Sequence, residues 1–265
     1  MCEELLVVVK GGGDLATGVA HRLHRAGMRV IITELPRPTV IRRPVAFASA
    51  VFEGGVTVEG VTARLVDGPA QALACLDEGV IPVLVDPQAE IVRALHPDAV
   101  VDATVAKRNL GTRLTDAPIV VALGPGFTAG VDCHAVVETA RGHYLGRVIT
   151  QGQAAPNTGV PGAVLGHAED RVVRAPCAGV FRGERRIGDR VEAGQSVARV
   201  DGEPVVARIS GVLRGLLADG LPVHAGMKVG DVDPRGVVDH CFTISDKARA
   251  VGGGVLEAIL WLRRQ

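Results

Sequence analysis

Residues 5–18 read LLVVVKGGGDLATG, and this stretch determines the predicted fold of the first part of the chain. The apolar run Leu5–Val9 is typical of a parallel strand that is buried on both faces. Behind the glycines, apolar residues recur at a spacing of four: Leu15, Val19 and Leu23. This spacing predicts an amphipathic helix that ends at Gly27, and Met28–Thr33 then has the pattern of a second strand.

The glycine turn and the acidic residue after the second strand resemble a dinucleotide-binding motif. Gly11-x-Gly13-x-x-Ala16 matches the relaxed fingerprint. Glu34 lies about twenty residues further on, where a ribose hydroxyl would bind. Backbone amides of such a turn can approach an anion at the positive end of the helix. Asp14 would place a negative charge beside a pyrophosphate, so a purely structural turn and a site for another anion stay open as alternatives.

Strand and helix patterns continue to alternate through the middle of the chain. Strand patterns lie at 56–66, 81–85, 99–105 and 119–123, with helical patterns at 70–76 and 90–95. This alternation predicts a parallel sheet with right-handed crossovers. Ligands bind such sheets beyond the carboxyl ends of the strands, so the loops at those ends are candidate sites.

Two of these loops add candidate binding residues to the glycine turn. The first follows the strand at 99–105 and offers two cations and an amide, which suit a phosphate or another oxyanion. A charge cluster that serves only a turn is the alternative interpretation. The second loop follows the strand at 119–123 and is rich in glycine. The predicted binding residues are Gly11, Gly12, Gly13, Asp14, Glu34, Lys107, Arg108, Asn109, Gly124 and Gly126.

A predicted hairpin, 133–139 with 145–150, places Asp132, His134 and Glu138 on one face. Such side chains could act as acid and base or bind a metal. Their spacing matches no clean metal motif, so no metal site is predicted. Cys133 is interpreted as a small core residue. No catalytic residue is identified, and whether the chain is an enzyme stays undecided.

The composition limits the classes of partner. The 29 basic and 29 acidic residues give no net charge, which argues against a nucleic-acid or membrane-surface binder. No run approaches the ~18 apolar residues that a membrane span needs. The acidic start before a short apolar run does not predict a signal peptide. The five cysteines are scattered without a CxxC pair, which is typical of reduced thiols, so a cytoplasmic protein is expected.

The segment after residue 171 repeats itself at an offset of 32 residues. Gly179-Val180 matches Gly211-Val212, and Ala193-Gly194 matches Ala225-Gly226. The repeat indicates two halves of short strands, neither of which could bury its own face. The pattern APxxGV at 175–180 with GDxVxAGQ at 188–195 resembles a biotinyl/lipoyl carrier domain. This resemblance implies a barrel-sandwich hybrid, but the hairpin at 200–205 lacks the lysine that carriers modify, which implies a structural or docking module.

The predicted fold class is therefore α/β: a Rossmann-like parallel sheet domain plus a small all-β barrel-sandwich hybrid of the biotinyl/lipoyl-like, lysine-free kind. The predicted domains are 1–170, with an extended loop and hairpin region at 106–170, and 171–235 for the two half-repeats. Residues 236–265 are predicted to form a C-terminal helix that packs back on the first domain. Gly252-Gly253-Gly254 is expected to interrupt this helix, leaving its amides open to an anion or its backbone close-packed.

Over nearly its whole length the chain resembles the YqeB family. The segments that carry the resemblance are GGGDLATGVAHRLH (11–24), 39–43, VDATVAKRN (101–109), GPGFTAGV (124–131), 134–143, PNTGVPG (156–162), 226–235 and 244–257. The resemblance implies an accessory protein of the selenium-dependent molybdenum hydroxylase system. It also makes the first domain similar in style to that of maturation factors that handle the molybdenum cofactor.

Three functions follow as expectations. The leading one is an accessory or maturation protein that binds molybdenum cofactor or a nucleotide form of it, with a molybdenum hydroxylase or a selenium-delivery protein as partner. The second is an NAD(P)-dependent oxidoreductase that uses Gly11, Gly13 and Glu34. The third is a non-catalytic scaffold that docks a hydroxylase or selenium donor through the lysine-free domain. The candidate cofactors are molybdenum cofactor or NAD(P), and neither nucleic acid nor a membrane is expected as a partner.

Overall fold

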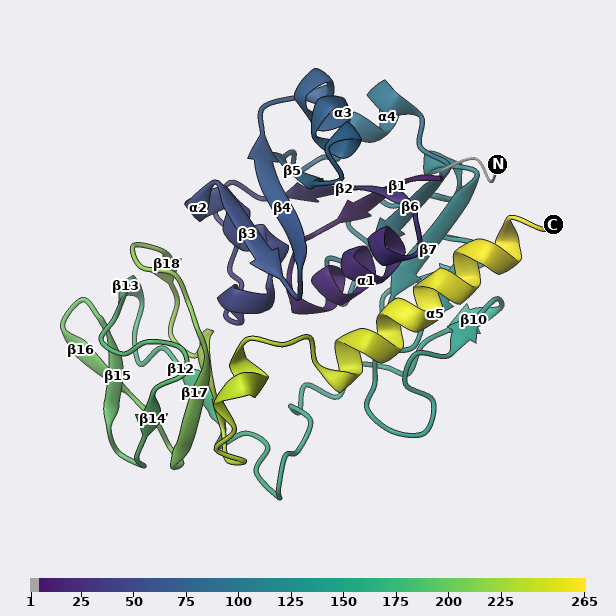
Figure 1. The fold of residues 1–265 in the computed structure, drawn as a ribbon. Helices are drawn as coiled ribbons and strands as arrows, with labels where there is room; N and C mark the ends of the chain where they lie inside the picture. The colour runs from purple at the N-terminus through teal and green to yellow at the C-terminus, as the bar shows by residue number, and fades with distance from the viewer. Residues whose placement is uncertain (1–4) are drawn as a thin grey trace. The chain divides into compact units, whose positions relative to one another are not determined.

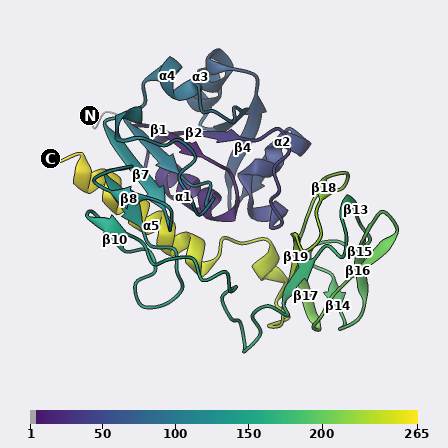
Figure 2. The same ribbon diagram turned by 180° about the vertical axis from the view of Figure 1, so that it is seen from behind.

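The computed structural model describes residues 5–265, which form two compact units. Unit 1 comprises Met1–Pro38, Ala46–Asn157 and Ile244–Gln265, and unit 2 comprises Thr39–Val45 and Thr158–Thr243. Figures 1 and 2 show the ribbon from opposite sides. Because the chain enters and leaves unit 2 twice, each unit is built from segments that are distant in sequence.

Unit 1 contains a nine-stranded sheet with the order β10-β9-β7-β6-β1-β2-β5-β4-β3. Its strands are β1 (Leu6–Lys10), β2 (Arg29–Glu34), β3 (Gly55–Val58), β4 (Val61–Val66), β5 (Ile81–Val85), β6 (Ala99–Asp102), β7 (Ile119–Leu123), β9 (Ala135–Val137) and β10 (Val148–Ile149). A two-stranded sheet pairs β8 (Thr128–Ala129) with β11 (Gly152–Gln153). The strands from β9 to β4 run parallel to their neighbours.

The sheet is mixed, so the predicted parallel sheet is wrong. At the two edges, β3 pairs antiparallel with β4 and β10 pairs antiparallel with β9. Only Glu59 and Gly60 join β3 to β4, and both have positive φ, at 45° and 81°. A two-residue turn of this kind reverses the chain, whereas a parallel neighbour requires a long crossover connection.

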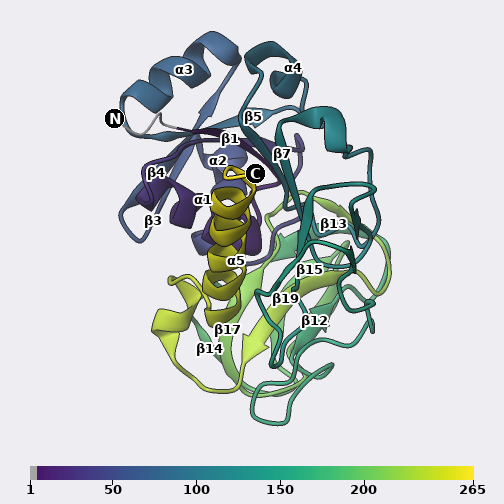
Figure 3. The ribbon, with the colours of Figure 1, turned by 90° about the vertical axis from the view of Figure 1, so that its right-hand side faces the viewer.

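Helices cover both faces of this sheet (Figures 1 and 3). The helices are α1 (Asp14–Arg25), α2 (Ala50–Glu53), α3 (Pro69–Asp77), α4 (Ile91–Leu95) and α5 (Asp246–Leu262). α3 and α4 lie on one face, where Val8, Ile31 and Val100 of the sheet are buried with them. α1 and α5 lie together on the other face. Short 3₁₀ helices are η1 (Arg43–Val45), η2 (Phe47–Ser49), η3 (Leu114–Asp116) and η4 (Val238–Cys241).

α5 runs without a break through Gly252, Gly253 and Gly254, so the predicted interruption is wrong. Its start is capped by Ser245, whose Oγ accepts the Ala248 N–H at 3.1 Å. The glycines are tolerated within the helix because tertiary packing can outweigh their low helix propensity.

Unit 2 contains two four-stranded antiparallel sheets with the orders β12-β19-β17-β14 and β16-β15-β13-β18. Its strands are β12 (Val172–Arg174), β13 (Gly179–Gly183), β14 (Arg190–Val191), β15 (Ser196–Val200), β16 (Glu203–Val206), β17 (Gly211–Leu216), β18 (Pro222–Val223) and β19 (Lys228–Asp233). One apolar core, which includes Phe181, Leu213 and Val229, draws residues from both sheets.

The strands of unit 2 recur at the offset of the sequence repeat. β13 begins at Gly179 and β17 at Gly211, while β15 begins at Ser196 and β19 at Lys228. Replacing each strand by its counterpart converts the order of one sheet into the order of the other. Each half of the repeat therefore contributes strands to both sheets.

The predicted biotinyl/lipoyl-like barrel-sandwich hybrid is wrong as a description of this unit. The structure has two separate antiparallel sheets, because β17 pairs with β14 and β19 while β13 pairs with β15 and β18. The lysine-free hairpin is the connection between β15 and β16. Asp201 and Gly202 form its turn with φ of 46° and 95°, which matches the twist of the strands on either side.

Within residues 5–265, no helix combines the length and the apolar character that crossing a bilayer requires. The cytoplasmic location expected from the cysteines stays a prediction.

Candidate functional site

The carboxyl edge of the sheet in unit 1 is the candidate site because the strand order changes direction there. β1 lies between β2, which follows it through α1, and β6, which the chain reaches only after β5. Ligands of open α/β sheets bind beyond the strand ends at such a switch point. The predicted binding residues lie at this edge, most of them in loops, with Asp14 at the start of α1 and Glu34 at the end of β2.

The glycine turn at this edge is filled by groups of the chain itself. The Gly12 N–H donates to Glu34 Oε1 at 2.8 Å, and the Gly12 carbonyl oxygen accepts the Ala48 N–H at 2.8 Å. A Cβ on Gly12 would lie 2.8 Å from the Ala48 nitrogen. Gly12 is therefore required for the close approach of two backbone segments, and the space beside it is occupied.

Glu34 also binds the protein backbone. Its Oε1 accepts the Gly12 N–H, and its Oε2 accepts the Leu35 N–H at 2.6 Å. Burial raises the pKa of this carboxyl, and the two hydrogen bonds oppose the shift. Both oxygens of this carboxylate are thus tied to backbone amides of the turn and of the residue after it.

Charged side chains of the protein itself already lie at the positive end of α1. Gly13 is its N-cap residue, and glycine has no side chain that could cap the helix. Asp14 Oδ1 accepts the Leu15 N–H at 3.0 Å, so a carboxylate lies at the positive end of the helix. Lys247 is partly buried nearby. Burial and the charge of Arg141 lower its pKa, against the opposing effect of Asp14.

The loop after β6 differs from the glycine turn because it is open and cationic. Lys107 and Arg108 are exposed, and neither side chain has an ion pair or hydrogen bond within residues 5–265. Val105 and Lys107 have φ of 53° and 63°, in a region that such side chains rarely adopt. Backbone strain of this kind clusters at functional sites, where the surrounding structure maintains it. The loop thus presents two cations at the switch point on a strained backbone.

Asn109 holds this loop in shape. Its Oδ1 accepts the N–H groups of Gly111 and Thr112, each at 2.8 Å. Its Nδ2 donates to the Thr112 carbonyl oxygen at 2.8 Å and to Asp132 Oδ1 at 3.1 Å. Both ends of the amide are committed within the protein, so Asn109 positions the loop while Lys107 and Arg108 remain exposed.

Buried Asp102, at the end of β6, anchors the same loop to the sheet. It is 2% exposed, and it accepts hydrogen bonds from Thr104 Oγ1 at 2.7 Å and Thr112 Oγ1 at 2.6 Å. Lys10 Nζ donates to Thr112 Oγ1 at 2.8 Å. Asp102 lies within the strand predicted at 99–105, where it is not a predicted site residue. A carboxylate at the end of an apolar run is the signal that could have singled it out.

Gly124 and Gly126 bring the loop after β7 against its neighbours. A Cβ on Gly126 would lie 2.6 Å from the Arg108 nitrogen and Cα, and a Cβ on Gly124 would collide with the Thr139 hydroxyl. Both glycines have positive φ, at 72° for Gly124 and 107° for Gly126. The loops after β6 and β7 are therefore in direct contact.

Asp132, His134 and Glu138 do not form a common site. Each is committed to a different backbone amide: Asp132 to Thr128, His134 to Val120, and Glu138 to Ala140 and Ala155. Burial lowers the pKa of His134, whose Nδ1 accepts the Val120 N–H at 2.9 Å. In the described part of the chain, no group of three or more such side chains could hold a metal ion.

Cys133 is a core residue with 0% exposure, and burial with the nearby charge of Asp132 raises its pKa to about 12. We expect its thiol not to react with iodoacetamide at mildly alkaline pH in the folded protein and to react after denaturation. Mass mapping of the labelled peptides checks this. Partly exposed Cys177 is the internal control and should react in the folded protein. Equal labelling of both thiols before denaturation would contradict the burial of Cys133.

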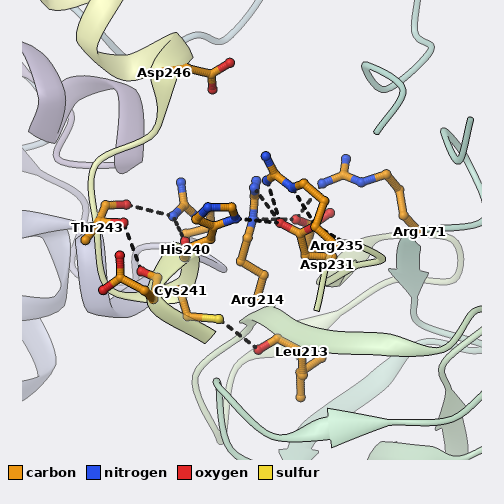
Figure 4. A network of polar contacts seen from close by, with 12 residues as sticks. Arg171, Leu213, Arg214, Asp231, Arg235, His240, Cys241, Thr243 and Asp246 are labelled. Carbon is orange, nitrogen blue, oxygen red and sulfur yellow. Dashed lines mark hydrogen bonds and ion pairs between the residues drawn. The ribbon is translucent and has the colours of Figure 1, made fainter. Parts of the chain in front are cut away.

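A second polar cluster lies within unit 2 (Figure 4). Asp233 Oδ2 lies 2.6 Å from Arg235 Nη2 and 3.3 Å from Arg214 Nη1. Asp231 Oδ2 lies 2.8 Å from Arg171 Nη2 and 3.2 Å from Arg214 Nε. Arg214 belongs to β17, both aspartates belong to β19, and Arg171 directly precedes β12. The cluster thus ties three neighbouring strands together, which indicates a structural role.

No protein-family model matches the chain. A protein of Escherichia coli (strain K12) named "Uncharacterized protein YqeB" is 55% identical over 260 residues, which cover 98% of this chain and 48% of that protein. The chain thus spans about half the length of this relative. The relative supports the resemblance to the YqeB family, and its name states no link to selenium or molybdenum hydroxylases.

Similar solved structures were found at low TM-scores. An aspartoacylase family protein from Mesorhizobium loti has a TM-score of 0.28 and 10% identity, over 87% of this chain and 85% of that one. The product-bound ectoine utilization protein EutE from Ruegeria pomeroyi has a TM-score of 0.26 and 16% identity, over 86% and 85%. A succinylglutamate desuccinylase/aspartoacylase from Rhodobacter sphaeroides has a TM-score of 0.24 and 16% identity, over 85% and 86%.

The functions expected from the sequence are therefore corrected. The NAD(P) oxidoreductase fails because Gly12 and Glu34 bind each other. The role in handling molybdenum cofactor relied on three loops at the sheet edge; the chain itself fills the glycine turn, and the Asn109 amide is committed to its own loop. The scaffold relied on a carrier-like domain, and the structure has two separate antiparallel sheets in its place.

Proposed function

We propose that unit 1 binds a small phosphate-bearing molecule at the carboxyl edge of its sheet, with Lys107 and Arg108 as the residues that hold the phosphate. One observation carries this proposal. Two adjacent exposed cations, without a carboxylate partner in residues 5–265, lie at the switch point in a loop that holds Val105 and Lys107 at positive φ.

The two side chains suit a phosphate group in complementary ways. The planar guanidinium of Arg108 can donate two parallel hydrogen bonds to two phosphate oxygens, while Lys107 supplies a compact charge. A phosphate monoester carries close to two negative charges at neutral pH, which two cations balance. The pair therefore matches a terminal phosphate in both charge and donor number.

The glycine turn supports this site from behind. A Cβ on Gly11 would lie 3.2 Å from the Ala103 carbonyl oxygen and 3.3 Å from the Thr104 Cα, the residues that lead into the cationic loop. Gly126 makes the equivalent close approach from the loop after β7. The predicted glycines thus position the loop, and the anion is bound one loop further along the sheet edge.

Isothermal titration calorimetry of the full chain with inorganic pyrophosphate tests the proposal. We expect saturable binding that the double variant Lys107→Ser/Arg108→Ser weakens by at least about tenfold, since hydrogen bonds to charged groups each contribute about 1.5–3 kcal/mol. Both side chains are exposed, so the variant should retain its fold. Circular dichroism checks that it does.

The matched control is Arg25→Ser/Arg93→Ser, which removes the same charge from unit 1. Arg25 ends α1 and Arg93 belongs to α4, and both are exposed. α1 runs back from the carboxyl edge and α4 leads into β6, so both arginines are directed to the opposite edge. We expect this control to bind like the unaltered chain. Equal weakening in the two double variants, or no saturable binding by the unaltered chain, would overturn the proposal.

A further inference from the structure

Unit 2 contains a cleft of about 440 Å³ beside the turn that joins β13 to β14. Three arginines and two acidic residues line it: Arg43, Arg185, Arg186, Glu184 and Asp219. Sites for small molecules have volumes of roughly 300–1,000 Å³, so the cleft is large enough for one. All the residues that line it belong to unit 2.

Hydrogen bonds to the backbone hold residues that line the cleft in place. Arg43 Nε donates to the Leu216 carbonyl oxygen at 2.9 Å. Asp219 Oδ1 accepts the Gly183 N–H at 2.8 Å. β15 holds the turn from Gly183 to Arg186 in place, since the Glu184 and Arg185 N–H groups both donate to the Val197 carbonyl oxygen. The cleft is therefore formed before any ligand binds.

The cleft carries an excess of positive charge. Glu184 is committed outside it, because its Oε1 accepts from Arg199 Nε at 2.5 Å and its Oε2 from Ser196 Oγ at 2.6 Å. Arg185 and Arg186 are exposed, and neither side chain has an ion pair in the described part of the chain. Their two charges are thus available to an anion.

We propose that this cleft binds a small organic polyanion, a molecule that carries two or more carboxylate or phosphate groups. The guanidinium groups of Arg185 and Arg186 donate to these oxygens, and Arg43 lines the same cleft. Ile187 offers an apolar contact for the carbon skeleton, and Asp219 can accept a hydrogen bond from a hydroxyl group. This site lies in a different unit from the one proposed above, and neither proposal depends on the other.

Two probes test the cleft: citrate for a polycarboxylate and inorganic pyrophosphate for a phosphate ligand. The titrations use the full chain carrying Lys107→Ser and Arg108→Ser, at constant ionic strength, so that the site proposed in unit 1 does not contribute. We expect at least one probe to bind saturably and the added pair Arg185→Gln/Arg186→Gln to weaken that binding by at least tenfold, about 1.4 kcal/mol or more.

The control pair is Arg182→Gln/Arg208→Gln, which removes two exposed arginines of unit 2 that do not line the cleft. We expect it to leave the affinity unchanged. Absence of saturable binding for both probes at millimolar concentration would overturn the proposal. Equal weakening by the two pairs would also overturn it, because the effect would then come from net charge alone.

Discussion

Replacing Asp233 by alanine is expected to lower the stability of unit 2 by about 3–5 kcal/mol. Asp233 is 0% exposed, and it binds Arg235 through both carboxylate oxygens and Arg214 through one. Arg214 is itself only 9% exposed. Removing the carboxylate leaves the Arg214 charge buried with fewer ion-pair partners. The resulting loss of folding free energy exceeds that of the lost hydrogen bonds alone.

Differential scanning calorimetry of the full chain measures this effect. Asp239→Ala is the matched control, since Asp239 is an exposed carboxylate of the same unit, and we expect a change within about 0.5 kcal/mol. An Asp233→Ala variant that melts like the control would show that the buried charges contribute little to the stability of the unit.

The same carboxylate predicts a dependence of stability on pH. Burial alone would raise the pKa of Asp233, but the hydrogen bonds and charge of Arg235, with the charge of Arg214, hold it at about 2, below the ordinary 3.8. Because the folded pKa is the lower one, this contribution is complete above the unfolded pKa and disappears as the pH falls toward 2. The contribution of this pKa shift to the free energy of unfolding amounts to about 2 kcal/mol. The gap in melting temperature between the unaltered chain and Asp233→Ala should therefore narrow in acid, and a constant gap would contradict the assignment.

The central strands could be predicted because their pattern is local. The runs at 81–85 and 119–123 coincide with β5 and β7, since a strand buried on both faces must be apolar along its whole length. Strand direction is not contained in such a run. The pattern at 56–66 is a hairpin of β3 and β4, and only the short turn at Glu59 and Gly60 determines that it is antiparallel.

The candidate site could be predicted as far as residue type and loop position allow. The glycines and the cations lie at one edge of the sheet because parallel strands bring their carboxyl ends together. Spacing does not reveal whether a polar group is already used by the chain. Ala48 is far in sequence from Gly12, and its backbone fills the turn only once the protein has folded. The bonding of Glu34 and Asn109 is a tertiary effect of the same kind.

The three glycines of α5 show that tertiary packing, and not helix propensity, determines whether this helix continues. Low helix propensity suggests a break, yet the helix continues because two of these residues allow backbones to approach closely. A Cβ on Gly252 would lie 2.6 Å from the Gly18 carbonyl oxygen of α1. A Cβ on Gly254 would collide with the Gly146 carbonyl oxygen and lie 2.9 Å from Val137 Cγ1. Of the two alternatives left by the sequence, the close-packed backbone is the one observed at these positions.

Gly254→Ala is therefore expected to destabilise unit 1 by about 1–3 kcal/mol, although alanine is the better helix former. Gly253 is the matched control within the same turn. Apart from its chain neighbours and the nearby backbone of its own helix, no atom of residues 5–265 lies within 4 Å of a Cβ built there. Gly253→Ala should gain up to roughly 1 kcal/mol of helix propensity without a steric cost. Scanning calorimetry of the full chain should thus show melting temperatures that move in opposite directions. A rise for both variants would contradict the close approach of α5 to Gly146, and a fall for both would contradict a continuous helix with an open face at Gly253.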